Sequence, residues 1–166
     1  KPLGESKKFI ELLKENGIKT AVWLFDLYFD LPVDRKFRLE DKDAPFNAEI
    51  IFSTDGGHQK EFEALGINHK LLRQGIYEPE AIMYDLPKDK DIIFVGGDIY
   101  KTRMMMLAGL YEHYSDRFTR YGIPGKIVRG LPLNELYGST KVVVGDSQPS
   151  PHYWSNRIYE TLGRGG

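Results

Sequence analysis

The chain has 166 residues, a formal net charge of -1 and 41% hydrophobic residues, enough for one ordinary domain or two small ones with a packed core. The near-neutral charge argues against a dedicated nucleic-acid binder, and the absence of Cys excludes a disulfide scaffold and any thiolate metal site. No apolar run approaches the roughly 20 residues of a membrane-spanning helix. This composition suits a cytoplasmic protein.

The first 76 residues alternate between helical and strand patterns. Apolar residues at helical spacing predict a helix over the stretch SKKFIELLKEN, which Gly17 ends. Short apolar runs predict three strands at 19–25, 48–54 and 68–72, with a helix at 59–65 between the second and the third. Because helix and strand alternate, we expect part of an α/β domain with a mostly parallel sheet.

A segment with Pro79, Pro87 and alternating charges predicts a linker over 77–90. The remaining residues, 91–166, again alternate strands with helices. The predicted strands are 91–95, 127–128 and 141–144, and the predicted helices are 101–114, 133–137 and 153–162. The fold class is therefore α/β, with two Rossmann-like halves. Both halves look incomplete, because the first starts on a helix and the second stops as a helix ends.

The stretch FVGGDIYKTR carries the first motif, an apolar strand that runs into glycines and then a helix. Gly96 and Gly97 would let a ligand approach the backbone, and the free N–H groups of the helix N-terminus attract anions. Lys101 and Arg103 would add positive charge to a bound phosphate. An ordinary tight turn with solvated Lys101 and Arg103 explains the stretch equally well.

The stretch KIVRGLPL carries the second motif, a strand that ends next to Gly130 and Leu131. The carboxyl edge of an open α/β sheet is where ligands bind. Gly130 and Leu131 would present backbone groups and an apolar wall to a flat base. Taken in isolation, a plain connecting loop is the better interpretation.

The stretch SNRIYETLGRGG carries the third motif. Glu160 lies four residues after Asn156 and three after Arg157, and these spacings fall on one face of a helix. That face offers two donors and one carboxylate, a good acceptor for the vicinal hydroxyls of a ribose. The alternative, slightly favoured without further context, is an Arg–Glu surface pair that stabilises the helix.

The three motifs, in this order within one α/β half, resemble the nucleotide-sugar-binding domain of GT-B glycosyltransferases of the group 1 and spore-maturation type. GIKTAVWLFD, AEIIFSTDGG and ALGINHKLLRQGIYEPEA resemble the end of that family's N-terminal domain and its inter-domain linker. The resemblance implies that 1–76 is the C-terminal part of an acceptor-side domain. It implies that 91–166 is a truncated nucleotide-sugar-binding domain.

The resemblance also implies an activity: transfer of a sugar from a nucleoside diphosphate sugar to an acceptor hydroxyl, without a metal or other cofactor. Glu160 would contact the ribose, and Arg103 and Lys101 would neutralise the diphosphate. Gly163 would let the following loop approach the donor. The expected partners are the nucleotide-sugar donor and a glycan, lipid or protein acceptor, with no nucleic acid.

One position departs from the family pattern. Many relatives carry a second glutamate eight residues before the position of Glu160, where this chain has His152, and Asp146 is a weaker substitute. The departure keeps an alternative open, a non-catalytic nucleotide- or sugar-binding module.

Two further positions have alternative interpretations. Asp26, at the end of a predicted strand, would bind acceptor or act as a base, although a helix cap or a loop aspartate is the simpler interpretation. Lys7 and Lys8 allow a peripheral contact with a membrane surface, and we favour a solvated helix face.

Overall fold

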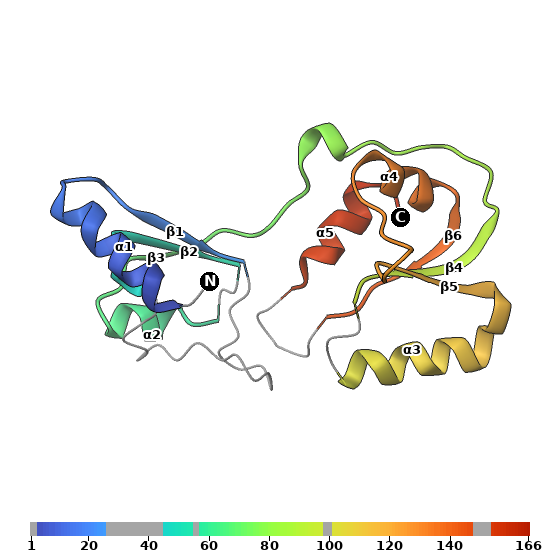
Figure 1. The fold of residues 1–166 in the computed structure, drawn as a ribbon, viewed down its shortest axis with the longest axis horizontal. Helices are drawn as coiled ribbons and strands as arrows, with labels where there is room; N and C mark the ends of the chain where they lie inside the picture. Colours follow the sequence, from blue (N-terminus) through green and yellow to red (C-terminus); the bar gives the residue numbers. More distant parts are fainter. Residues whose placement is uncertain (1–2, 26–44, 55–56, 98–100, 148–153) are drawn as a thin grey trace. The chain divides into compact units, whose positions relative to one another are not determined.

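The computed structural model describes residues 3–25, 45–54, 57–97, 101–147 and 154–166. The chain forms two compact units (Figure 1): Lys1–Gln74 with Ser147–Trp154, and Gly75–Asp146 with Ser155–Gly166. Each unit holds a three-stranded sheet in which all pairs are parallel, so the predicted α/β class is confirmed. None of the helices in these ranges has both the length and the apolar character needed to cross a bilayer.

The first unit packs two helices against one face of its sheet. Its elements are α1 (Leu3–Glu15), β1 (Ala21–Leu24), β2 (Ile50–Ser53), α2 (Gln59–Ala64) and β3 (His69–Leu71), with strand order β1-β2-β3. Ile10 of α1 and Ile51 of β2 share a buried cluster with half-buried Val22. Phe62 of α2 stacks on His69, which pairs with Ile51 in the parallel register. Both helices therefore cover the face that carries Ile51.

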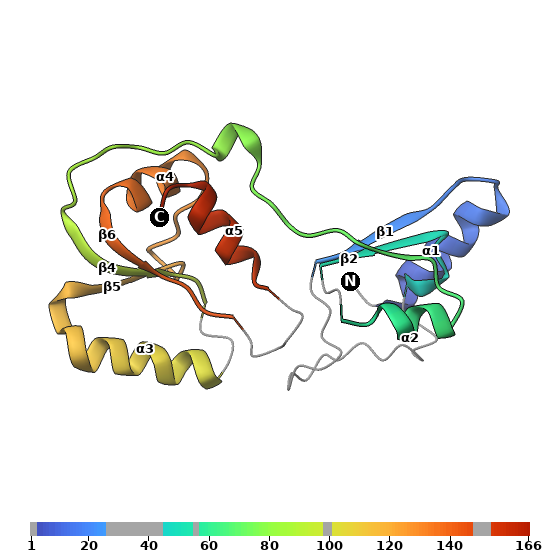
Figure 2. The same cartoon turned by 180° about the vertical axis from the view of Figure 1, so that it is seen from behind.

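The second unit is built around its central strand. Its elements are β4 (Lys90–Val95), α3 (Lys101–Tyr114), β5 (Phe118–Tyr121), α4 (Leu131–Gly138), β6 (Thr140–Val144) and α5 (Asn156–Gly163). The strand order is β5-β4-β6, so β4 has a neighbour on both sides. Figures 1 and 2 show α3 on one face of this sheet and α4 and α5 on the other.

The apolar run of β4 explains this arrangement. Ile93 and Phe94 are both fully buried, and successive strand residues point to opposite faces. Phe94 packs in a cluster with Leu107 of α3. Ile93 packs in a separate cluster with Leu136 and Tyr137 of α4. A strand that is apolar on both faces needs a helix on each side, which α3 and α4 supply.

Two sequence predictions in this unit are wrong. The predicted strand at 127–128 does not form, and the strand is instead β5, nine residues earlier. Phe118 of β5 is buried in the α3 cluster, whereas Ile127 is 66% exposed, so burial decides between the two segments. The last helix begins at Asn156 rather than at Tyr153, because the Ser155 side chain accepts a hydrogen bond from the Arg157 N–H and caps it.

The predicted linker packs on the second unit. Asn134 of α4 is fully buried, and its Nδ2 donates to the main-chain oxygens of Glu80 (2.6 Å) and Ile82 (2.8 Å). Its Oδ1 accepts from Nη1 of Arg164, whose Nη2 donates to the Glu80 carboxylate. Asn134 therefore ties the segment around Glu80 to α4 and to the end of α5.

We predict that Asn134→Ala lowers the free energy of unfolding by about 2–4 kcal/mol, because it leaves two carbonyls and Arg164 without their buried partner. Urea unfolding followed by far-UV circular dichroism measures this. Tryptophan fluorescence is unsuitable because both tryptophans belong to the first unit, whereas Asn134 belongs to the second. Glu135→Ala, at an exposed position of the same helix, is the control and should change stability by less than about 0.5 kcal/mol. Equal losses in the two variants would contradict the prediction.

Candidate functional site

The carboxyl ends of β4 and β6 form the place in the second unit where a ligand is expected. The connection from β4 through α3 leads to β5, while the connection through α4 leads back across β4 to β6. The sheet is therefore extended in opposite directions on the two sides of β4. Open α/β sheets bind ligands at such a switch point, just beyond the strand ends. Gly96 and Gly97 follow β4 there, and Gly145 and Asp146 follow β6.

Two arginines meet on one carboxylate at this point. Arg103 lies in the first turn of α3, and Arg157 lies in the first turn of α5. Nε of Arg103 donates to Oδ2 of Asp146 at 2.7 Å, and Nη1 of Arg157 donates to Oδ1 at 2.6 Å. The side chains of Arg103, Arg157 and Asp146 are only 9%, 16% and 16% exposed. We call Arg103 and Arg157 the arginine pair.

Main-chain carbonyls hold the arginine pair independently of Asp146's carboxylate. Nη1 of Arg103 donates to the oxygen of Gly97 at 2.9 Å. Nε of Arg157 donates to the oxygen of Val95 at 3.1 Å. Val95 is the last residue of β4 and Gly97 lies two residues beyond it, so each guanidinium is fixed to the end of the central strand.

The buried ring of Phe94 supports both guanidinium groups. The Cζ atoms of Arg103 and Arg157 lie 5.7 Å and 5.0 Å from the ring centroid. Such cation–π contacts contribute on the order of 0.5–2 kcal/mol each, more when the site is desolvated. Phe94 thus serves both the core beneath α3 and the arginine pair.

The surroundings of Arg157 disfavour its positive charge. Burial lowers the pKa of the Arg157 guanidinium, and the like charge of Arg103 lowers it further, against the opposite effect of Asp146. Arginine nevertheless stays protonated in proteins. Because Asp146, Tyr137 and Glu160 together do not fully offset burial and repulsion, an anion with more charge than one carboxylate would be favourable close to Arg157. The N-termini of α3 and α5 add partial positive charge at the same place.

Gly96 makes room for Arg157. A Cβ atom added to Gly96 would lie 2.6 Å from Nη2 of Arg157 and 3.2 Å from the Phe94 ring. The residue also has a φ of 156°, which residues with a side chain rarely adopt. The sequence predicts that this glycine lets a ligand approach the backbone, whereas in the structure the space above it holds the Arg157 guanidinium.

Glu160 lies one turn after Arg157 on α5 and is half-buried. In the described part of the chain its carboxylate accepts no hydrogen bond and forms no ion pair, and Arg157 pairs with Asp146 instead. The surface pair between Arg157 and Glu160, the alternative interpretation of the sequence, is therefore not formed. Nη2 of Arg157 likewise has no hydrogen-bond partner among the described residues.

Most of the other predicted site residues lie at helix ends. Lys101 and Asn156 are the exposed first residues of α3 and α5. Gly130 caps α4, and its oxygen accepts from Nη1 of Arg164 at 3.3 Å, while Leu131 is 46% exposed.

Gly163 packs against the side chain of Ile76, which an added Cβ would meet at 2.6 Å. The space next to this glycine is therefore filled by the chain itself. Asp26 and His152 lie outside the described residues.

Sequence reasoning missed two members of the site and underrated a third. Phe94 belongs to the predicted strand 91–95, and nothing in a buried strand pattern marks a ring that also supports two arginines. Ser155 has a visible signal, since Ser directly before a helix is a favoured N-cap. Asp146 follows β6 as Gly97 follows β4, so its position after a strand was the signal for its place in the site.

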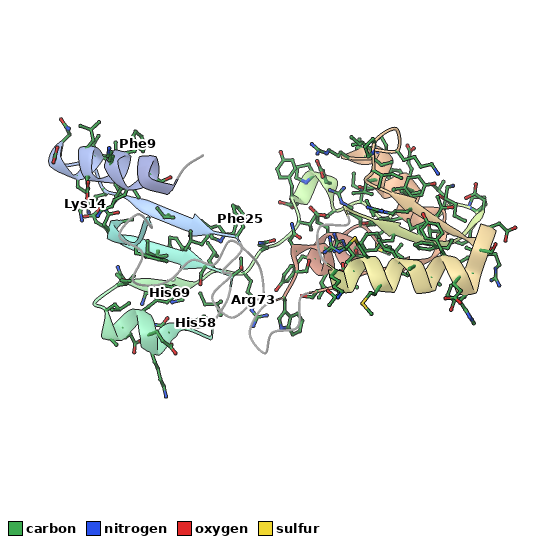
Figure 3. All side chains as sticks on the ribbon, turned by 60° about the horizontal axis from the view of Figure 1, so that its bottom comes forward. Phe9, Lys14, Phe25, His58, His69 and Arg73 are labelled. Atoms are coloured by element: carbon green, nitrogen blue, oxygen red, sulfur yellow. The ribbon has the colours of Figure 1, made fainter. Side chains whose placement is uncertain are left out.

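A second group of polar side chains lies in the first unit. Oγ of Ser53 and Nε2 of His69 are 2.5 Å apart, and Nδ1 of His69 is 2.5 Å from Oε1 of Gln59. His69 lies on β3 beside α2 (Figure 3), where Phe62 stacks on its ring at 4.3 Å. A Ser–His pair is typical of nucleophilic catalysis, but Ser53 is 0% and His69 2% exposed, so neither can touch a substrate. We interpret this group as a polar link between β2, β3 and α2.

No protein-family model matches the chain, and no curated protein and no solved structure matches it. The arrangement of side chains at the ends of β4 and β6 therefore carries the functional argument.

We predict that Gly96→Ala destabilises the chain by about 1–3 kcal/mol, because the new methyl group overlaps Nη2 of Arg157 and the backbone conformation is strained. Gly145→Ala is a matched control beside the same arginine, since its nearest contact is the Arg157 Cδ at 4.0 Å. Urea unfolding measures both variants. If Gly145→Ala costs as much as Gly96→Ala, the close contact with Arg157 is not what constrains Gly96.

Proposed function

We propose that the second unit binds the diphosphate of a nucleoside diphosphate sugar. We further propose that the chain is a cytoplasmic, metal-independent glycosyltransferase with Rossmann-like halves of the GT-B type. The donor is the nucleotide sugar, and the acceptor is a hydroxyl of a glycan, a lipid or a protein. The order of the sequence motifs supports the family, and the geometry at the ends of β4 and β6 supports the ligand.

The observation that carries this proposal is the arginine pair at the switch point. Arg103 and Arg157 come from two different helix N-termini and converge on a single carboxylate. Paired guanidinium groups in a partly buried site are suited to phosphate, because each can donate charge-assisted hydrogen bonds to its oxygens. The burial that lowers the pKa of Arg157 makes the gain from an added anion larger than it would be at a solvated surface.

Glu160 supports the nucleotide part of the proposal. Its carboxylate is one helical turn from Arg157, is half-buried and has no hydrogen bond or ion pair among the described residues, although its charge favours the protonated form of Arg157. A carboxylate in this state is a ready acceptor for two hydroxyl groups on neighbouring carbons, as a ribose offers. Arg157 and Glu160 would then contact the phosphate and the sugar of the same nucleotide.

In the proposed reaction the bond between the anomeric carbon and the phosphate oxygen breaks, and its electron pair leaves with the diphosphate. The acceptor oxygen forms the new bond to that carbon and gives up its proton. Asp26, a candidate from the sequence, remains the proposed base. The arginine pair would stabilise the negative charge that grows on the leaving diphosphate.

We predict that UDP, GDP or ADP binds to the chain and that Glu160→Ala weakens the binding of that nucleotide by about 1–3 kcal/mol, the loss of a hydrogen bond to a charged group. Calorimetric titration of each nucleotide measures this. Glu135→Ala removes an equal charge from an exposed position of α4 and should leave the affinity within about twofold, as for other distant surface changes. Absence of binding by a folded chain would refute the proposed site.

Turnover separates the transferase from a non-catalytic binding module. We expect the sugar nucleotide of the preferred base to release nucleoside diphosphate slowly to water and faster with an acceptor. Release would be followed by a coupled assay for the free diphosphate. Tight binding without any release would favour the module.

A further inference from the structure

We infer that Asp146 is an internal competitor for the anion site, so that a bound diphosphate takes the place of its carboxylate between Arg103 and Arg157. The inference rests on the anion site proposed above and adds how that site is occupied before the ligand arrives.

The geometry places the Asp146 carboxylate where a bridging phosphate would bind. Its two oxygens accept from different arginines, Oδ2 from Nε of Arg103 and Oδ1 from Nη1 of Arg157. A phosphate group that bridged the pair through Nε of Arg103 and Nη1 of Arg157 would use the two donors that now hold the carboxylate. The carboxylate and a bridging phosphate therefore exclude each other.

The donors would stay in place after the carboxylate leaves. Nη1 of Arg103 remains bound to the oxygen of Gly97, and Nε of Arg157 remains bound to the oxygen of Val95. The Phe94 ring still supports both guanidinium groups. The arginine pair is thus preorganised by the end of β4, and Asp146 is the exchangeable partner.

Charge gives the exchange its direction. Asp146 brings one negative charge to two guanidinium groups, whereas a diphosphate brings at least two. The lowered pKa of Arg157 indicates that the carboxylate leaves part of the cost of burial and repulsion uncompensated. A singly charged anion gains nothing over Asp146, which is already tethered beside the site. Asp146 would therefore act as a filter that admits diphosphates and rejects weaker anions.

The test is titration of inorganic pyrophosphate into the full chain and into Asp146→Asn, at fixed ionic strength, by calorimetry. We expect Asp146→Asn to bind pyrophosphate about tenfold or more tightly, because a competitor held by charged hydrogen bonds has been removed. Asp116→Asn removes the same charge beyond the far end of α3 and is the control for general electrostatics. Its affinity should stay close to that of the unmodified chain.

The outcomes separate this inference from the proposed function. If pyrophosphate binds the unmodified chain but binds Asp146→Asn equally or more weakly, Asp146 positions the arginines and the inference is wrong, while the anion site stands. If neither protein binds pyrophosphate, the inference and the proposed function fail together.

A second readout does not depend on the stability of the variant. Carbon-13 NMR of the aspartate carboxyl groups in the unmodified chain should show the assigned Asp146 signal move on addition of pyrophosphate, as its hydrogen bonds to the arginines break. An Asp146 signal that stays fixed while pyrophosphate binds would overturn the inference.

Discussion

The site in the second unit depends on how two like-charged groups are held close together at the end of β4. Arg103 and Arg157 would repel each other across the Phe94 ring, and burial removes most of the water that would weaken this repulsion. The Gly97 and Val95 carbonyls hold the two guanidinium groups, and Asp146 offsets part of their repulsion because each of its oxygens accepts from one arginine. The position of Asp146 is in turn set by the pairing of β4 with β6, in which Phe94 lies opposite Val144. Two residues further along, Gly96 and Asp146 are therefore level at the edge of the sheet.

The register of β4 against β6 thus decides where Asp146 lies relative to Gly96. A slip of one residue would turn the residues of β6 to the opposite face and would move Asp146 relative to the end of β4. The apolar residues of β4 fix the register, because Ile93 and Phe94 each fill a separate core cluster on opposite sides of the sheet. Packing that looks purely structural consequently determines the distance between the arginines.

The sequence predicted the parallel α/β halves, because their short apolar runs and glycine stops are local signals. It placed β5 wrongly because Ile127 and Val128 have the better strand composition, whereas Phe118 has the buried position beside α3. The motifs also indicated Gly96, Arg103 and Arg157, which the structure brings to one sheet edge. Helical spacing suggested an Arg157–Glu160 pair, but spacing cannot show that Arg157 turns away from its own helix. Its bonds to Val95 and Asp146 come from residues 62 and 11 positions away in the chain, so only the folded sheet reveals them.

The helix that carries Arg157 and Glu160 is fixed by polar contacts at both of its ends. No residue from Asn156 to Gly163 is fully buried, although most are half-buried and Gly163 packs against Ile76. Arg157 fixes its first turn to β4 and β6, while Arg164, just past its last turn, binds Asn134 and the Glu80 carboxylate. Because both contacts belong to one short helix, a displacement at one end also moves the other end. It follows that the segment around Glu80, which touches no predicted ligand, helps to set the orientation of Arg157 and Glu160.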